Sequence, residues 1–328
     1  MKAHCAKNRG HPIEATHRVN RGSGWPDRTI IMMAIRTALG YWVTPARLAA
    51  TVIGATLLTS CSGGLRQGWR AYERQDYDVA ALAWEQVAAR GDLRAQFLLG
   101  TMHFEGKGMP VDRASAARCF RSSAERGYAP AQNNLGLMYF QGDGVAQDRG
   151  EAAKWFQLAS DQGFVKAQNN LAVMQLLGVA TPRAAGETRT LLAAAAAGGD
   201  PSAQFLKGSI DGDAESQHER FDWTERAAKQ GMASAQTRLA WMYLRGDGVA
   251  RDDAKAAQWF RRAAEQGSVT AQANLGLMYL RGQGVPQDDA EALRWSRRAA
   301  EQGSTIAQVR VAMWPEEGSV ASAPVDQE

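Results

Sequence analysis

The chain has 328 residues, of which 45% are hydrophobic, 8% aromatic and 22% charged, a balance that excludes wholesale disorder. Thirty-three glycines against ten prolines, without a Gly-X-Y period, exclude a collagen. The formal net charge of +4 arises within residues 1–60, which carry eight Lys or Arg and two Asp or Glu, whereas the rest of the chain is slightly acidic. A nucleic-acid partner therefore has no electrostatic basis.

Residues 1–60 are predicted to form a leader with a lipoprotein signal segment. Arg47 precedes an apolar run over 48–58, which is too short to span a bilayer of about 30 Å as a helix. A charged start, a short apolar core and small residues before a break are typical of a secretory signal. The run ends in Leu58-Thr59-Ser60-Cys61, which resembles the bacterial lipobox.

This resemblance implies that Cys61 is the lipid attachment site and the first residue of the mature chain. A thioether-linked diacylglycerol and an N-acyl chain give three acyl chains, enough for stable anchoring. Ser62, rather than Asp, follows the cysteine, which resembles the pattern of lipoproteins sorted to the outer membrane. We therefore expect the protein on the inner leaflet of the bacterial outer membrane, facing the periplasm. The alternative is a chance apolar patch, and Met32 or Met33 is an alternative start to Met1.

The next predicted element is an N-terminal capping helical hairpin over residues 62–91, in which Trp69, Tyr72 and Trp84 pack inward. Self-comparison of the sequence then reveals a repeat. The dipeptide Ala-Gln recurs at spacings of 36, 36, 36, 32, 36 and 36 residues. The alanines in this register are Ala95, Ala131, Ala167, Ala203, Ala235, Ala271 and Ala307. Glycines recur in the same register from Gly91 to Gly303.

Each repeat is predicted to be a pair of helices. In the second unit, the first helix is expected over 130–141, and Gly142 ends it because glycine accepts the left-handed geometry of a helix C-terminus. Asp148 is expected to cap the second helix, with Glu151 completing a capping-box-like pair. Gly136 is expected to let the two helices approach closely. One hairpin cannot bury its apolar stripe alone, so stacked hairpins form a single continuous core.

The motifs Leu135-Gly-x-Met-Tyr, Gly142-x-Gly-Val, Ala152-Ala-x-Trp-Phe and Gln162-Gly resemble the Sel1-like repeat, a relative of the tetratricopeptide repeat. The resemblance covers about residues 92–306. The predicted fold is an all-α solenoid of about six 36-residue helical hairpins plus the N-terminal capping hairpin. The solenoid is expected over 92–314, and the polar residues 315–328 are expected to be a disordered C-terminal tail.

The third and fourth units depart from this pattern. Residues 178–182 replace the Gly-x-Gly turn of the third unit, and Lys207 stands at the leucine position of the fourth. These changes are either tolerated degeneracy or a bend or binding feature that involves Asp211, Asp213 and Glu215.

No catalytic residue, metal site or cofactor is predicted. Three of the five histidines lie in the leader, His103 stands where other units have tyrosine, and His218 lies in the altered fourth-unit loop. Neither His-Glu-x-x-His nor Gly-x-Ser-x-Gly occurs. Cys119 stands where other units have tryptophan, so we interpret it as an inert, buried thiol. Cys5, Cys61 and Cys119 are too few for a disulfide framework.

A solenoid presents an extended concave surface, lined mainly by the first helix of each hairpin. Polar residues predicted to be exposed there, where amides could clamp an extended peptide as in the tetratricopeptide family, are Asn133, Asn134, Asn169, Asn170, Arg238 and Asn274. The resulting hypothesis is a non-enzymatic, lipid-anchored periplasmic adaptor that recruits envelope proteins. The alternatives are a peptidoglycan- or glycan-binding envelope sensor and a β-lactamase-like cell-wall hydrolase. The paired cysteines of Sel1-like proteins associated with that last activity are missing here.

Overall fold

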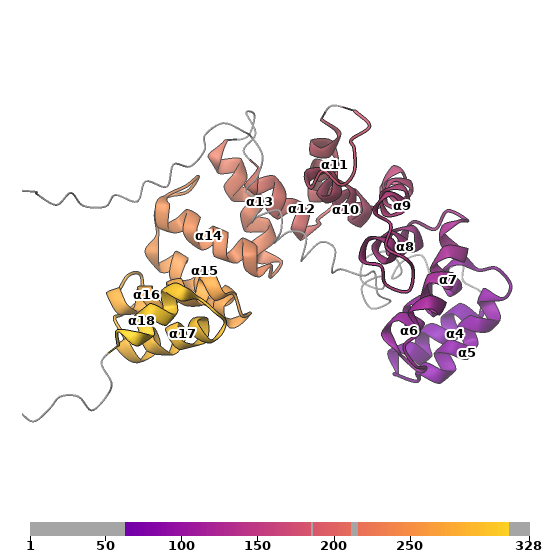
Figure 1. The fold of residues 1–328 in the computed structure, drawn as a ribbon, viewed down its shortest axis with the longest axis horizontal. Coiled ribbons are helices and arrows are strands. Elements are labelled where there is room, and N and C mark those ends of the chain that lie inside the picture. Colours follow the sequence, from indigo (N-terminus) through magenta and orange to yellow (C-terminus); the bar gives the residue numbers. More distant parts are fainter. Residues whose placement is uncertain (1–62, 185, 211–215, 315–328) are drawn as a thin grey trace, which may run out of the picture.

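In a computed structural model, the described residues, 63–184, 186–210 and 216–314, form fifteen α-helices and no strand. The helices follow one another as an elongated stack, with α4 at one end and α18 at the other (Figure 1). Substantial backbone contacts between helices join each helix to the next along the chain. The predicted all-α solenoid is therefore confirmed.

The helices are α4 (Gly63–Glu73), α5 (Tyr77–Ala88), α6 (Leu93–Glu105), α7 (Arg113–Ala124), α8 (Ala129–Gln141), α9 (Arg149–Asp161), α10 (Val165–Leu176), α11 (Glu187–Ala197), α12 (Pro201–Ser209), α13 (Gln217–Lys229), α14 (Ala233–Arg245), α15 (Asp253–Glu265), α16 (Val269–Arg281), α17 (Asp289–Glu301) and α18 (Thr305–Ala312).

The ends of α8 and α9 follow from their capping residues. Gly142 closes α8 in the left-handed conformation, at φ +75°, as expected. The Asp148 side chain accepts a hydrogen bond from the Glu151 backbone N–H and so caps α9. The Glu151 carboxylate pairs with Lys154 instead of completing a capping box. A reciprocal capping box forms at Ser216 and Glu219, at the start of α13.

Close packing within a hairpin depends on a glycine in the first helix. A Cβ atom at Gly136 would lie 2.8 Å from Cε1 of Phe156, whose side chain is fully buried. The same arrangement joins Gly100 to Phe120. Because the ring occupies the space that a side chain would need, α8 and α9 approach at their backbones, as the sequence predicted.

The Ala-Gln dipeptides hold successive repeats together. Gln236 donates a hydrogen bond from Nε2 to the Ala228 carbonyl at the end of the preceding hairpin, at 3.2 Å. Its Oε1 accepts a bond from Gln266 Nε2 at 2.8 Å. The pairs Gln132–Gln162, Gln204–Gln230 and Gln272–Gln302 repeat this second bond within their own hairpins, whereas the bonds of Gln132, Gln204 and Gln272 to Ala124, Ala196 and Ala264 repeat the first bond to the preceding hairpin. The glutamine of the dipeptide is therefore a buried link between neighbouring hairpins.

The first hairpin, α4 and α5, packs through aromatic side chains. Tyr72 stacks on Trp69 at a centroid distance of 5.9 Å and lies 5.6 Å from the fully buried Trp84. Lys107, in the turn after α6, donates a hydrogen bond to the Tyr72 hydroxyl at 2.7 Å. The hairpin thereby joins the first full repeat at a cluster of rings and a lysine.

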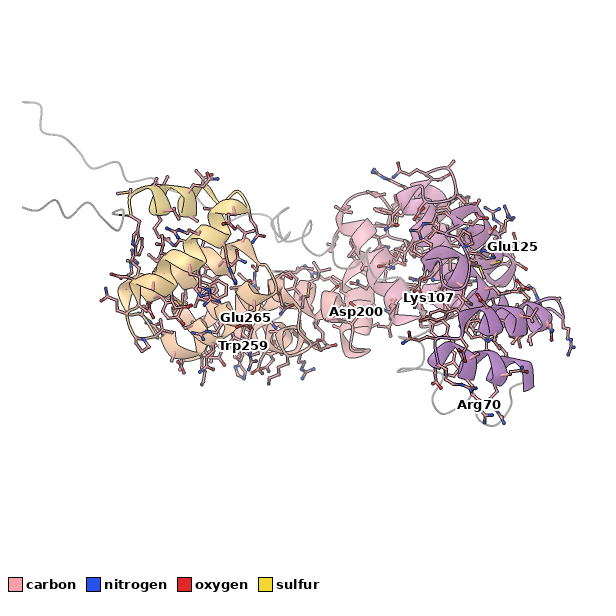
Figure 2. All side chains as sticks on the ribbon, turned by 90° about the horizontal axis from the view of Figure 1, so that it is seen from below. Arg70, Lys107, Glu125, Asp200, Trp259 and Glu265 are labelled. Carbon is pink, nitrogen blue, oxygen red and sulfur yellow. The ribbon has the colours of Figure 1, made fainter. Side chains whose placement is uncertain are left out.

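The middle of the array differs from its ends. Helix α10 ends at Leu177 in the right-handed helical region, and α12 ends at Ile210 in an extended conformation. In Figure 2, the labelled Asp200 lies between the N-terminal repeats, in purple, and the C-terminal repeats, in orange and yellow. The segment with Asp211, Asp213 and Glu215 lies outside the described residues, so its predicted role stays a prediction.

The leader with Cys61 and the tail over 315–328 also lie outside the described residues. Within the part of the chain that the structure describes, no helix has the length and apolar character needed to cross a membrane.

Candidate partner-binding groove

The predicted exposure of the asparagine row is wrong for four of its residues. Asn133 and Asn134 are fully buried, and Asn169 and Asn170 have exposed fractions of 1% and 2%. The Asn170 side chain donates to Asn133 Oδ1 at 2.9 Å, so two amides from successive first helices bond to each other. Whether these asparagines contact a partner stays a prediction, but the exposed row that suggested it does not exist there.

The physical reason for this burial lies in the register of the row. The side chain at the repeat position of Asn134 and Asn170 can reach back to the first helix of the preceding hairpin, as that of Asn170 does to Asn133. Arg238 donates from Nη2 to the Gly208 carbonyl of α12 at 3.4 Å, and Arg310 donates from Nη1 to the Ala273 carbonyl of α16 at 2.8 Å. Asn274 instead donates to the Thr270 carbonyl of its own helix. Arg238 and Asn274 are half-buried, so both retain some exposed surface.

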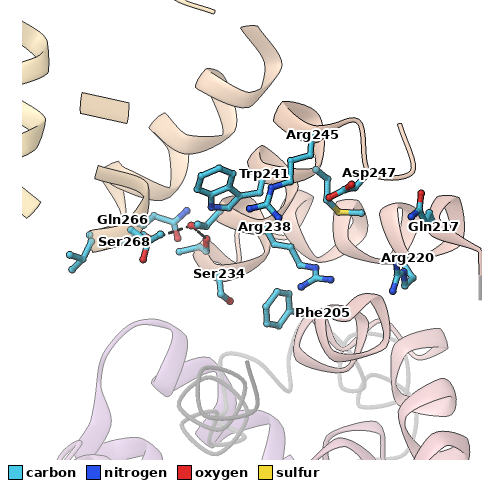
Figure 3. Close-up of a pocket in the computed structure, with 16 residues that line it drawn as sticks. Phe205, Gln217, Arg220, Ser234, Arg238, Trp241, Arg245, Asp247, Gln266 and Ser268 are labelled. Carbon is cyan, nitrogen blue, oxygen red and sulfur yellow. Dashed lines mark hydrogen bonds between the residues drawn. The ribbon is translucent and has the colours of Figure 1, made fainter. Parts of the chain in front are cut away.

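A groove of about 930 Å³ lies along α14. Its walls come from α12 and α13 on one side and from the turn between α15 and α16 on the other (Figure 3). The residues that line it are Phe205, Gln217, Arg220, Ala233, Ser234, Thr237, Arg238, Trp241, Met242, Arg245, Asp247 and the segment 266–270. Of the six predicted binding residues, the groove contains only Arg238.

One face of α14 forms the floor of the groove. Ser234, Arg238, Trp241 and Arg245 are spaced three or four residues apart, so they share a side of the helix. The Trp241 ring is held edge-to-face against Phe260, at a centroid distance of 5.5 Å and an interplanar angle of 89°. The Arg245 guanidinium lies 5.0 Å from the centroid of the Trp241 ring. The indole is therefore fixed on two sides.

Three guanidinium groups and one carboxylate line this groove. Arg220 comes from α13, Arg238 and Arg245 from α14, and Asp247 from the turn that follows α14. Sequence reasoning missed Trp241 and Arg245. The signal was present, because the positions equivalent to Trp241 in the second and sixth units hold Leu137 and Leu277. A change from leucine to the larger tryptophan, whose ring carries an N–H donor, marks the surface that one unit uses differently.

Three side chains with possible chemical roles are His103, His218 and Cys119. His103 is half-buried, as expected for a packing residue, and His218 is exposed with its Nδ1 3.1 Å from the Gly248 carbonyl. Cys119 is half-buried and unbonded, and burial raises the pKa of its thiol above the ordinary value. Among the described residues, no three His, Cys, Asp or Glu side chains gather in an arrangement that could hold a metal ion.

The chain belongs to the Sel1 repeat family. The family model for the Sel1 repeat matches residues 93–128, 129–164, 165–200, 221–232, 233–268 and 269–304, more than half of the chain. The partial match at 221–232 falls in the fourth unit, whose departure from the pattern the sequence had indicated. Sel1 repeats generally mediate protein–protein interactions. No curated protein matches the chain.

A solved structure of a Sel1 repeat protein resembles this fold. A Sel1 repeat protein from Oxalobacter formigenes is 26% identical, with a TM-score of 0.65 over 73% of this chain and 97% of that one. A protective antigen of uropathogenic Escherichia coli with an SLR fold is 27% identical, with a TM-score of 0.36 over 86% and 78% of the two chains. A putative Sel1 repeat protein from Klebsiella pneumoniae is 22% identical, with a TM-score of 0.39 over 60% and 97%.

Proposed function

We propose that the protein is a lipid-anchored, non-enzymatic adaptor of the bacterial envelope that binds a protein partner in the groove along α14. The observation that carries the proposal is the groove itself, a concave surface with a fixed tryptophan and three arginines on a repeat scaffold. Tryptophan and arginine are the side chains that most often dominate protein interfaces. The repeat family supports the same reading, because its members generally act through protein contacts.

The anchoring part of the proposal rests on the lipobox-like sequence that ends at Cys61. Metabolic labelling with an alkyne-bearing fatty acid tests it, with Cys61→Ser as the variant and Cys5→Ser as the matched control. We expect label on the wild-type chain and on Cys5→Ser, and none on Cys61→Ser. Label retained by Cys61→Ser would reject the anchor. Fractionation of the envelope then tests the outer-membrane location, with the chain expected in the outer-membrane fraction.

The adaptor part is tested by photo-crosslinking in cells. A photoreactive amino acid at Trp241 reports on the groove, and the same group at Leu158, an exposed residue of α9, is the control. We expect a discrete protein adduct from position 241 only. Adducts of equal yield from both positions, or from neither, would reject the groove as the site. Co-sedimentation with purified sacculi in place of an adduct would favour the glycan-binding alternative.

A further inference from the structure

The last helix of the stack, α18, exposes an apolar stripe (Figure 1). Ile306, Val309 and the cap residue Met313 are spaced three and four residues apart, so they share one side of the helix. Their exposed fractions are 71%, 54% and 78%, and no other described helix exposes more than two large hydrophobic side chains. A groove of about 510 Å³ lies along this stripe, and Leu280 of α16 and Trp314 also line it.

The α18 stripe is a stacking surface of the solenoid. The residues at the register of Val309 and Met313 in the second unit are Asn133 and Leu137. Both are fully buried, and the first helix of the next hairpin, α10, reaches Asn133 through the Asn170 side chain at 2.9 Å. On α18 the same face is open, because no helix within the described residues follows it in the stack. The stripe therefore continues the interface by which repeats pack on one another.

The opposite end of the array has a different surface. The exposed side chains of α4 are all charged or polar: Arg66, Gln67, Arg70 and Glu73. A polar outer face is what a terminal repeat needs in water, and the α18 end does not have one. Contact of one copy's α18 with another copy's α4 would bury these charged groups against the apolar stripe, which is unfavourable. The two ends of the array therefore do not match each other.

The surface that complements the α18 stripe is a second α18 stripe. In an antiparallel pair of α18 helices, a twofold axis beside Val309 places each Ile306 opposite Met313 of the second copy and the two Val309 side chains opposite each other. A twofold contact of this kind closes on itself and forms no filament. Residues 315–328 hold two large apolar residues, Val320 and Val325, so a second stripe supplies more apolar surface than this segment does.

The charged residues of the C-terminal groove are compatible with such a pair. Arg310 follows Val309 on α18, but it donates from Nη1 to the Ala273 carbonyl at 2.8 Å and to Ser296 Oγ at 3.3 Å, so its guanidinium is held against its own chain. Asp289 of α17 lines the same groove. The groove thus carries one charge of each sign beside an apolar stripe.

We propose that the α18 stripe is a dimer interface, on which a second copy of this chain packs its own α18 in the antiparallel direction. The stripe spans about two helical turns. The interface is therefore smaller than the about 800 Å² that each partner buries in a standard complex, and the dimer is weak. None of the residues that line this groove lines the groove along α14. The inference is therefore independent of the proposed function.

Photo-crosslinking in cells that express two differently tagged copies of the full chain tests the dimer. A photoreactive amino acid replaces Val309, and the same group at Leu82, an exposed residue of α5, is the control. We expect an adduct that carries both tags from position 309 and none from position 82. Equal yields from the two positions would mean unspecific contact and would overturn the inference. It would also fail if position 309 gave no adduct, or linked only to another protein or to residues 315–328 of its own chain.

A charge exchange at position 309 tests the twofold axis, with the photoreactive group now at Met313. Val309→Arg in both copies, or Val309→Glu in both, places like charges opposite each other and should lower the yield of the two-tag adduct at least about fivefold. Co-expression of the Val309→Arg copy with the Val309→Glu copy should restore the yield, because residue 309 of one copy faces residue 309 of the other.

Val79→Arg, at an exposed position of α5, is the matched control and should leave the yield unchanged. Thermal unfolding of each variant, followed by circular dichroism, should match that of the wild-type chain because both positions are exposed. A yield that Val309→Arg leaves unchanged would overturn the interface. A mixed pair that fails to restore the adduct would overturn the twofold arrangement.

Discussion

The C-terminal repeats, α14 to α17, and the middle of the array, α10 to α13, carry the same repeat plan with different side chains. Helices α14 and α16 end on the left-handed Gly246 and Gly282, whereas α10 and α12 end without a left-handed cap. Helix α12 has nine residues where α14 has thirteen. Degeneration of this repeat therefore affects its turns and helix ends before it affects helix pairing.

The hydrophobic clusters of the two regions also differ in the size of their buried side chains, which are larger in the C-terminal repeats. Phe260, Tyr243 and Trp295 belong to the core of the C-terminal repeats. The buried residues of the middle cluster are small, with Leu192 and Leu206 as the largest, and the one ring packed against them, that of Trp223, is only partly buried. Since large rings bury more apolar area, the C-terminal repeats form the more stable platform, and the proposed binding groove lies on them.

The largest expected effect comes from a matched pair of core truncations. Phe260 and Leu192 occupy the same register in the fifth and third units, and both are buried. Phe260→Ala should lower the free energy of local unfolding by about 3–5 kcal/mol, and Leu192→Ala by about 2–3 kcal/mol, because the smaller side chain leaves the smaller cavity. Native-state hydrogen exchange of α15 and α11 measures both, since repeat arrays need not unfold in one step. A greater cost at Leu192 would contradict the ranking of the two regions.

The turn glycines give the next effect. A Cβ atom at Gly284 would lie 2.1 Å from the Asp253 carbonyl oxygen, and φ is +68°. Gly267, at φ +88°, has open space around the same position. Gly267→Ala should therefore cost about 1 kcal/mol from backbone strain alone, and Gly284→Ala at least about twice that. Thermal unfolding followed by circular dichroism compares them, and equal costs would show that the contact with the preceding hairpin is unimportant. The third unit carries Ala180 at the register of Gly284.

A smaller effect is expected from the glutamine links. Gln266→Ala removes the bond to Gln236 Oε1, a largely buried acceptor, and should cost about 1 kcal/mol. Gln258→Ala, an exposed glutamine of α15, is the control and should change the free energy of unfolding little. The third unit has Gly198 at the register of Gln266, so the equivalent bond between its own two helices is missing there. Urea denaturation tests the pair, and indistinguishable midpoints would remove the glutamine link from the account.

The smallest effect concerns Asp200, which caps α12 by accepting bonds from the backbone N–H groups of Ser202 and Ala203. Burial raises the pKa of this carboxyl above its ordinary value. Since the folded chain then binds the proton more tightly than the unfolded chain, this group's contribution to stability falls as pH rises from the ordinary aspartate range through the raised pKa. Asp200→Asn keeps the cap without the charge, so at neutral pH it should stabilise the middle repeats by less than about 1 kcal/mol. Thermal unfolding at two pH values should show the gain vanish in acid, and a gain that persists there would contradict this cause.

Much of the fold could be predicted from the sequence because one residue pattern repeats in register. Gly142 and Asp148 specify helix ends through local backbone chemistry, and Gly136 specifies a close approach that Phe156 fills. Such features depend on a few neighbouring residues. The repeat then carries them from unit to unit.

The candidate site was harder to predict because exposure on a solenoid depends on neighbouring repeats. The pattern of a single hairpin predicts Asn133 and Asn170 to be surface residues. In the stacked array, however, they bond to each other between two hairpins. Trp241 and Arg245 depart from the repeat pattern, and only the packed structure places them beside Arg220 of the preceding helix. A sequence pattern identifies the repeated surface, whereas the groove arises from what differs between units.

Hydrogen exchange of the full chain, alone and with the protein captured by crosslinking at position 241, tests the central claim, that the C-terminal repeats bind a protein partner along α14. We predict slower amide exchange in α14 and the first turn of α16, and unchanged exchange in α6 to α9. The Arg245→Ala variant should lose that protection. Unchanged exchange in α14, or protection centred on the N-terminal repeats, would contradict the account.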